Sequence, residues 1–117
     1  MSEDKQIILV CGGRDYTKHR KVEAVLDPIK DNVGVVIEGG APGLDTCVRR
    51  WCIQNGVHYA TVPALWDTYK KAAGPKRNWA MSLLKPDKCI AFPGGRGTEN
   101  MVSVCNRQGI PVDIMEE

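Results

Sequence analysis

The chain has 117 residues, of which 43% are hydrophobic and 26% are charged. This length and composition are typical of one globular domain with a packed core, so we expect a single domain over residues 1–117. The net charge of +2 does not favour a nucleic-acid partner. No apolar run approaches the roughly 20 residues that span a bilayer, so we expect no membrane segment.

The cysteines and the start of the chain bear on location and metals. The chain has five cysteines but no CxxC pair, and it begins with the polar run MSEDKQ rather than a secretory signal pattern. These features predict reduced thiols and a cytoplasmic protein. Neither histidine lies near a suitably spaced pair of cysteines, so we expect no metal site, and no motif predicts a resident cofactor.

Strand-like and helix-like segments alternate along the chain. Apolar runs predict strands at residues 6–11, 33–38, 57–63, 88–92 and 110–114. Helical spacing of apolar residues predicts helices at about 17–28, 44–55, 76–85 and 98–108, with an irregular stretch at 64–75. Thr17 and Thr98 are the predicted N-caps, and Gly56 and Gly109 the predicted ends of their helices. This order predicts an α/β fold: a Rossmann-like, doubly wound parallel sheet of about five strands in a three-layer sandwich.

Three of the predicted strands end in glycine turns that lead into helices: CGGRDYT, EGGAPGLDT and PGGRGTENM. In a doubly wound sheet, ligands bind at the carboxyl ends of the strands. Free amides at a helix N-terminus and the close backbone approach that glycine allows both suit a phosphate. The alternative for each turn is tight geometry without a ligand. No turn matches GxGxxG or GxxxxGK, so neither the dinucleotide fingerprint nor the P-loop is predicted.

Candidate ligand-binding residues come from these turns and from the segment GPKRN. They are Gly12, Gly13, Arg14, Gly39, Gly40, Gly43, Asp45, Arg77, Asn78, Gly94, Gly95, Arg96, Gly97 and Thr98. The guanidinium groups can pair with phosphate. Asp15 fits an Asx turn or a helix cap better than a ligand contact. Glu38 ends the second predicted strand and is expected to face the same crevice.

Residues 66–79, WDTYKKAAGPKRNW, combine aromatic and cationic side chains. Lys71 is placed to reach a phosphate, and Trp66 or Tyr69 to stack on a base. The alternative is a solvated loop over the sheet edge, with Trp79 packed in the core. Both alternatives stay open for the two stacking candidates.

The motif PGGRGT followed by a helix resembles PGGxGTxxE of the lysine-decarboxylase-like phosphoribohydrolases. These belong to the SLOG superfamily, which also includes the DNA-processing protein of bacterial transformation. Four segments, CGGRDYT, EGGAPGLDT, KKAAGPKRNWAM and FPGGRGTENM, resemble in this order a small SLOG family of bacteria and their phages. The resemblance covers roughly residues 7–112. It implies a Rossmann-like fold, a nucleotide or nucleotide-derived ligand at the glycine turns, and a homo-oligomer.

The resemblance also identifies a departure from the enzymes. In the phosphoribohydrolases an arginine and the glutamate of PGGxGTxxE assist cleavage of an N-glycosidic bond. The arginine corresponds to Arg77, but the glutamate position falls on Met101, which cannot activate a water or stabilise a cationic sugar. Met101 fits the apolar stripe of its helix and is predicted to lie in the core. Arg77 and Glu38 remain the candidates for catalysis.

Three functions compete. The leading prediction is a module that binds a nucleotide or nucleotide-derived ligand, as a sensor or by sequestering it. The alternative in the enzyme class is a nucleoside 5′-monophosphate N-glycosidase, which the missing carboxylate disfavours. The third is binding of single-stranded nucleic acid through Lys70, Lys71 and Lys76, which the low net charge disfavours.

Overall fold

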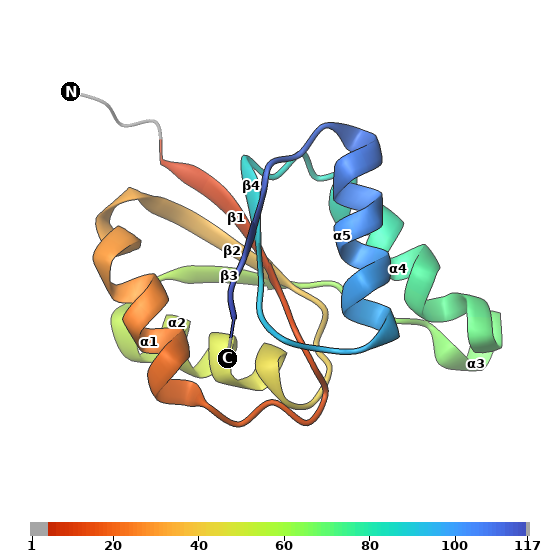
Figure 1. Cartoon of the computed structure of the whole chain (residues 1–117), viewed down its shortest axis with the longest axis horizontal. Coiled ribbons are helices and arrows are strands. Elements are labelled where there is room, and N and C mark those ends of the chain that lie inside the picture. Colours follow the sequence, from red (N-terminus) through yellow and green to blue (C-terminus); the bar gives the residue numbers. More distant parts are fainter. Residues whose placement is uncertain (1–4, 117) are drawn as a thin grey trace.

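The computed structural model describes residues 5–116 and has a five-stranded sheet at its centre (Figure 1). The strands are β1 (Gln6–Cys11), β2 (Val33–Glu38), β3 (His58–Thr61), β4 (Lys88–Ala91) and β5 (Val112–Ile114). All neighbours pair in parallel, in the order β3-β2-β1-β4-β5. The predicted Rossmann-like parallel sheet is confirmed.

The strand order reverses in the middle of the sheet. From β1 the chain adds β2 and β3 on one side, then returns to place β4 and β5 on the other. The connections that leave β1 and β4 therefore run toward opposite faces. Their separation opens a crevice at the carboxyl ends of these strands, where doubly wound sheets bind ligands.

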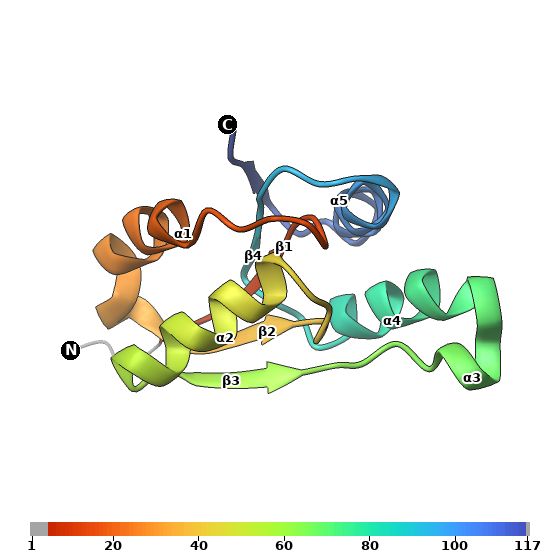
Figure 2. The same ribbon diagram turned by 90° about the horizontal axis from the view of Figure 1, so that it is seen from below.

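Helices cover both faces of the sheet and make the predicted three layers. The helices are α1 (His19–Leu26), α2 (Leu44–Asn55), α3 (Trp66–Tyr69), α4 (Ala73–Ser82) and α5 (Arg96–Gln108), with 3-10 turns η1 (Asp27–Asn32) and η2 (Lys70–Ala72). Helices α1 and α2 lie on one face, and α4 and α5 on the other (Figures 1 and 2). Within residues 5–116, no helix is long and apolar enough to cross a bilayer.

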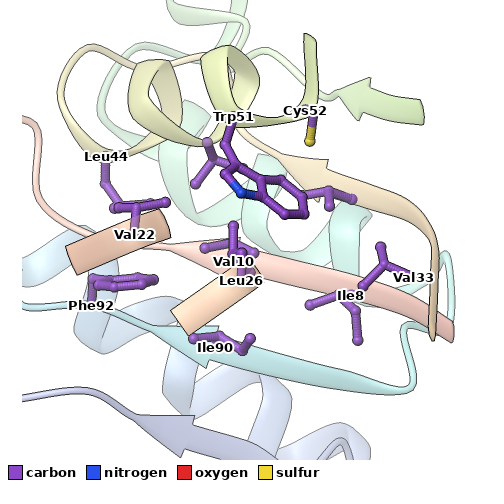
Figure 3. Packing of buried hydrophobic residues seen from close by; sticks show 12 residues of the cluster. Ile8, Val10, Val22, Leu26, Val33, Leu44, Trp51, Cys52, Ile90 and Phe92 are labelled. Carbon is purple, nitrogen blue, oxygen red and sulfur yellow. The ribbon is translucent and has the colours of Figure 1, made fainter. Parts of the chain in front are cut away.

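Alternate residues of β1 pack into two separate hydrophobic cores, one on each face of the sheet. Ile8 and Val10 pack toward α1 and α2, where the indole of Trp51 lies over the sheet (Figure 3). The Nε1 of Trp51 donates a hydrogen bond to Asp27 at the start of η1 (2.8 Å), so this large side chain is buried with its polar atom satisfied.

The second core lies between the sheet and the pair α4 and α5. It includes Leu9, Met81 and Met101. Met101 is 1% exposed, which confirms its predicted place in the core. Each strand that lies in the middle of the sheet is thus apolar on both faces, which is why the strands read as continuous apolar runs in the sequence.

Several predicted helix boundaries are wrong. Helix α1 begins at His19 with Lys18 as N-cap, and α5 begins at Arg96 with Gly95 as N-cap, so neither Thr17 nor Thr98 is the capping residue. Helix α4 spans Ala73–Ser82 rather than 76–85, because Pro75 falls in its first turn, where no backbone donor is needed. Gly56 and Gly109 end their helices in the left-handed conformation, as predicted.

Candidate functional site

A cleft of about 520 Å³ lies at the carboxyl ends of the strands, where their order reverses. Its floor includes Val10, Cys11, Met81 and Met101. Charged side chains line the rest, namely Arg14, Asp15, Asp45, Lys71, Arg77 and Arg96. The turns after β1, β2 and β4 and the start of α4 together form its walls.

The three glycine turns are locked against one another. The amide of Gly13 donates to the carbonyl of Pro93 (2.9 Å), and the carbonyl of Gly13 accepts from the amide of Leu44 (3.0 Å). A Cβ on Gly12 would lie 2.5 Å from Cγ of Leu44, and one on Gly43 would lie 2.4 Å from the oxygen of Gly13. Glycine at these two positions is therefore required for the turns to pack, whether or not a ligand binds.

The third turn presents free backbone donors to the cleft. Among the described residues, the amides of Arg96, Gly97 and Thr98 at the start of α5 donate to no protein acceptor, as expected for the first turn of a helix. A Cβ built on Gly95 or Gly97 would meet no atom within 4 Å. These two glycines line the cleft and leave the helix N-terminus open to it.

The second turn, in contrast, satisfies its own amides with carboxylates. Oδ2 of Asp45 accepts from the amides of Gly39 (3.2 Å) and Ala41 (3.1 Å), and Oε1 of Glu38 accepts from the amide of Gly40 (2.6 Å). The two acids thus occupy the position that an anionic ligand would take in a phosphate-binding turn. These three amides are not available to a phosphate.

The expectation that Glu38 faces the crevice is wrong. Its side chain is fully buried and does not line the cleft. Its carboxylate turns toward β3 and α2, where it accepts a hydrogen bond from the hydroxyl of Thr61 and lies 3.9 Å from Nε of Arg49. Glu38 therefore stabilises the turn after β2, and its engaged oxygens make it a poor candidate for catalysis.

Asp45 is the buried acid that does line the cleft. Burial raises the pKa of its carboxyl from 3.8 to about 6, and the negative charge of Glu38 adds to the rise, while amide donors and Arg77 oppose it. Both backbone amides donate their hydrogen bonds to Oδ2, and Oδ1 has no hydrogen-bond partner among the described residues. Asp45 can thus exchange a proton near neutral pH.

Arg77 and Asn78 join the turns to the helices α4 and α5. Nη1 of Arg77 donates to the carbonyl of Gly39 (2.6 Å), and its Nε donates to Oδ1 of Asn78 (3.0 Å). The side-chain Nδ2 of Asn78 donates to the carbonyl of Gly97 (3.2 Å) and to Oδ1 of Asn100 (2.9 Å). Burial lowers the pKa of Arg77, although a guanidinium stays charged at neutral pH. The positive charge of Arg77 is therefore fixed beside Asp45.

The cleft gathers most of the candidate residues. Those that line it are Gly12, Gly13, Arg14, Gly39, Asp45, Arg77, Asn78, Gly95, Arg96, Gly97 and Thr98, whereas Gly40, Gly43 and Gly94 lie behind it. Trp66 and Lys71 also line it and Tyr69 does not. Sequence reasoning missed Asn100, although its place one helical turn after Arg96 could have indicated it.

Comparison with known proteins shows which family and which relatives this chain resembles. Residues 6–69 match the family described as YAcAr, the YspA, cpYpsA-related SLOG family. The Gene 61 protein of Mycobacterium phage D29 is 34% identical over 117 residues, which cover 90% of this chain and 92% of that protein. The family match includes the first two glycine turns.

Among solved structures, the fold is similar to that of DNA processing protein A (DprA) from Streptococcus pneumoniae. The TM-score is 0.78 at 21% identity, over 94% of this chain and 50% of that chain. The present chain thus corresponds to about half of the larger protein. On the match to the family over residues 6–69 and on the phage relative, this chain belongs to the YspA, cpYpsA-related SLOG family.

Proposed function

We propose that the chain binds a nucleotide or a nucleotide-derived ligand in the cleft, with a phosphate at the N-terminus of α5. The observation that carries this proposal is that the amides of Arg96, Gly97 and Thr98, at the edge of the cleft, have no acceptor among residues 5–116. Such a helix N-terminus combines directed donors with a partial positive charge, which is the combination that binds phosphate.

The side chains around the cleft support an anionic ligand. Four basic and two acidic side chains line it, so its field favours an anion. The basic residues Arg14 and Arg96 come from the two turns that flank the reversal in strand order. Both are exposed and are free to pair with phosphate oxygens.

The acidic end of the cleft suits a sugar rather than a second phosphate. Asp45 closes the second turn and has an oxygen without a partner among the described residues. A carboxylate there accepts hydrogen bonds from hydroxyl groups and repels a phosphate. A ligand with a phosphate at α5 and ribose hydroxyls toward Asp45 satisfies both ends.

Thermal shift and calorimetry against a panel of nucleotides test this proposal. The panel holds the four nucleoside 5′-monophosphates, cyclic dinucleotides and ADP-ribose. We expect at least one to stabilise the protein, and Arg96→Ala to weaken its binding about tenfold, the loss of one charged hydrogen bond. Arg107→Ala, at the exposed far end of the same helix, is the matched control. A panel in which no nucleotide stabilises the protein would sink the proposal.

A second candidate is hydrolysis of the N-glycosidic bond of a nucleoside 5′-monophosphate. It is favoured by Asp45, a cleft-lining carboxylate with its pKa raised to about 6 beside a fixed arginine. Such a group can take a proton from water as the water oxygen bonds to C1′ and the C1′–N bond breaks; the bonding pair leaves on the base nitrogen, which takes up a proton from solvent. Release of free base by the wild type, lost in Asp45→Asn, is the expected result. If the wild type releases no base from bound nucleotides, the chain is a binding module.

A further inference from the structure

We propose that Trp66 and Lys71 contact the ligand and are carried on a lid, residues 64–72, that closes over the cleft with the indole stacked on the base. This inference rests on the proposed function, since it takes the phosphate to be held at α5. It adds the surface that recognises the base and the motion that brings it there.

The lid buries little of its surface against the rest of the protein, although Nζ of Lys76 on α4 lies 4.8 Å from the centre of the Tyr69 ring. Every residue from Leu65 to Ala72 is exposed, and neither α3 nor η2 has a buried side chain. Figure 2 shows α3 at the far end of the molecule, beyond the end of the sheet. A segment with so little buried surface opens and closes at low cost in free energy.

Large apolar side chains are exposed on this lid. Leu65, Trp66 and Tyr69 are 54%, 48% and 43% exposed. Together they make an apolar surface that gains free energy when it is covered. The indole of Trp66 lies against Gly74, where a Cβ would approach it to 3.4 Å, and both residues border the cleft. A base entering the cleft is the flat apolar partner that this position accommodates.

The backbone of the lid is strained at one position. Lys70, which joins α3 to η2, has φ of +52° and ψ of −127° without being glycine. This conformation costs on the order of 1–3 kcal/mol. Pro63 and the Gly74–Pro75 pair flank the segment. Rotation at Lys70 would release the strain as the lid closes, and Lys71, the next residue, already borders the cleft.

Two probes separate recognition of the base from recognition of the phosphate. The first is the tightest binder among the four nucleoside 5′-monophosphates and ADP-ribose, and the second is ribose 5-phosphate, which has no base. We expect Trp66→Ala to weaken binding of the nucleotide about tenfold or more, the loss of one stacking contact, and to leave ribose 5-phosphate unaffected. Trp79→Ala is the matched control, because Trp79 is 43% exposed but does not line the cleft.

Hydrogen exchange then tests the motion itself. In the free protein, amides of residues 66–72 should exchange at least a hundredfold faster than those of α4, and the nucleotide, but not ribose 5-phosphate, should slow them. Slow exchange in the free protein, or equal affinity of Trp66→Ala and wild type, overturns the lid. If Arg96→Ala weakens binding while the lid stays unprotected, only this inference fails. If no probe binds, the proposed function and the lid both fail.

Discussion

Glycines around the cleft serve two different purposes at the scale of single residues. Gly12 and Gly43 leave room for Leu44 and for the backbone of the first turn, so they belong to the packing of the scaffold. Gly95 and Gly97 face open space at the edge of the cleft. Within the motif PGGRGT, a Cβ on Gly94 would lie 2.7 Å from the amide nitrogen of Gly13, so Gly94 is needed for folding, whereas Gly95 and Gly97 expose the start of α5, and substitutions can separate the two purposes.

Substitution of Gly97 by alanine should strengthen the fold and weaken ligand binding. The residue lies in the first turn of α5 with a negative φ and no neighbour within 4 Å of an added Cβ, so alanine is expected to raise the free energy of unfolding by about 0.5–1 kcal/mol. The same methyl group stands among the amides that we assign to the phosphate. Urea unfolding and calorimetry measure the two effects.

The control for this variant is Gly56→Ala, which adds the same methyl group to another position with open space. Gly56 has φ of +66° and lies far along α2 from its N-terminus. Alanine there should lower stability, because it is strained in the left-handed region, and leave binding unchanged. Unaltered nucleotide affinity in Gly97→Ala would show that the first turn of α5 does not hold the ligand.

The raised pKa of Asp45 predicts a specific dependence of stability on pH. Between 3.8 and about 6, the folded protein holds a proton that the unfolded chain has lost, so this residue's contribution makes stability fall as pH rises through that window. The variant Asp45→Asn has no carboxyl group at this position that could gain or lose a proton. Relative to Asp45→Asn, the wild type should lose up to about 3 kcal/mol across that window and no more above it. Urea unfolding of both proteins at several pH values measures this difference, and a constant difference would contradict it.

At the scale of secondary-structure elements, Asn78 is the tie between α4 and the first turn of α5. It is buried, donates to the carbonyl of Gly97 and to Asn100, and accepts from Arg77. Asn78→Ala removes these three partly buried hydrogen bonds, so we expect a loss of about 1–3 kcal/mol in the free energy of unfolding. Because Arg77 and α5 lose a common support, nucleotide affinity should fall as well.

The matched control for this prediction is Asn106→Ala, which changes an exposed asparagine on α5, the helix that Asn78 contacts. It should change the free energy of unfolding by less than about 0.5 kcal/mol. Thermal and urea unfolding of the two variants give the comparison. Equal stability of Asn78→Ala and wild type would show that the contact does not hold the helices together.

The order of strands and helices could be predicted because each element has its own apolar pattern, continuous in the strands and periodic in α1, α2 and α5. The direction in which a side chain points at the end of a strand could not be predicted from the sequence. Glu38 and Arg14 both follow apolar runs beside glycines, yet one is buried toward Arg49 and the other lines the cleft. That choice depends on the tertiary position of Thr61 and α2, which no local pattern records.

The short helix α3 could not be predicted from its local sequence pattern either. Residues 64–75 have no apolar period, because the side chains of α3 face solvent and the cleft rather than a core. Most of the candidate binding residues were found because strand ends converge in a parallel sheet. Asn100 was missed because it lies inside a helix, one turn after the motif.

For the molecule as a whole, the sheet connects two cores that lie on opposite faces. Cys52 is buried in the core under α1 and α2, and Cys105 in the core under α4 and α5. Since β1 contributes alternate residues to both cores, loss of this strand removes packing from each. We infer that the two faces unfold together, as a single domain does.

Thiol labelling tests this cooperativity at both faces in one experiment. Burial raises the pKa of Cys52 to about 12, and a hydrogen bond to Cys89 together with burial raises that of Cys105, so neither thiol reacts until the protein opens. With increasing urea, the opening free energies at Cys52 and Cys105, measured by peptide mass spectrometry, should agree with each other and with global unfolding followed by circular dichroism. The half-buried Cys47 on α2 should label faster and serves as the internal control. Labelling of Cys105 at lower urea than Cys52 would mean that α4 and α5 detach from a sheet still covered by α1 and α2, and that the chain unfolds in two units.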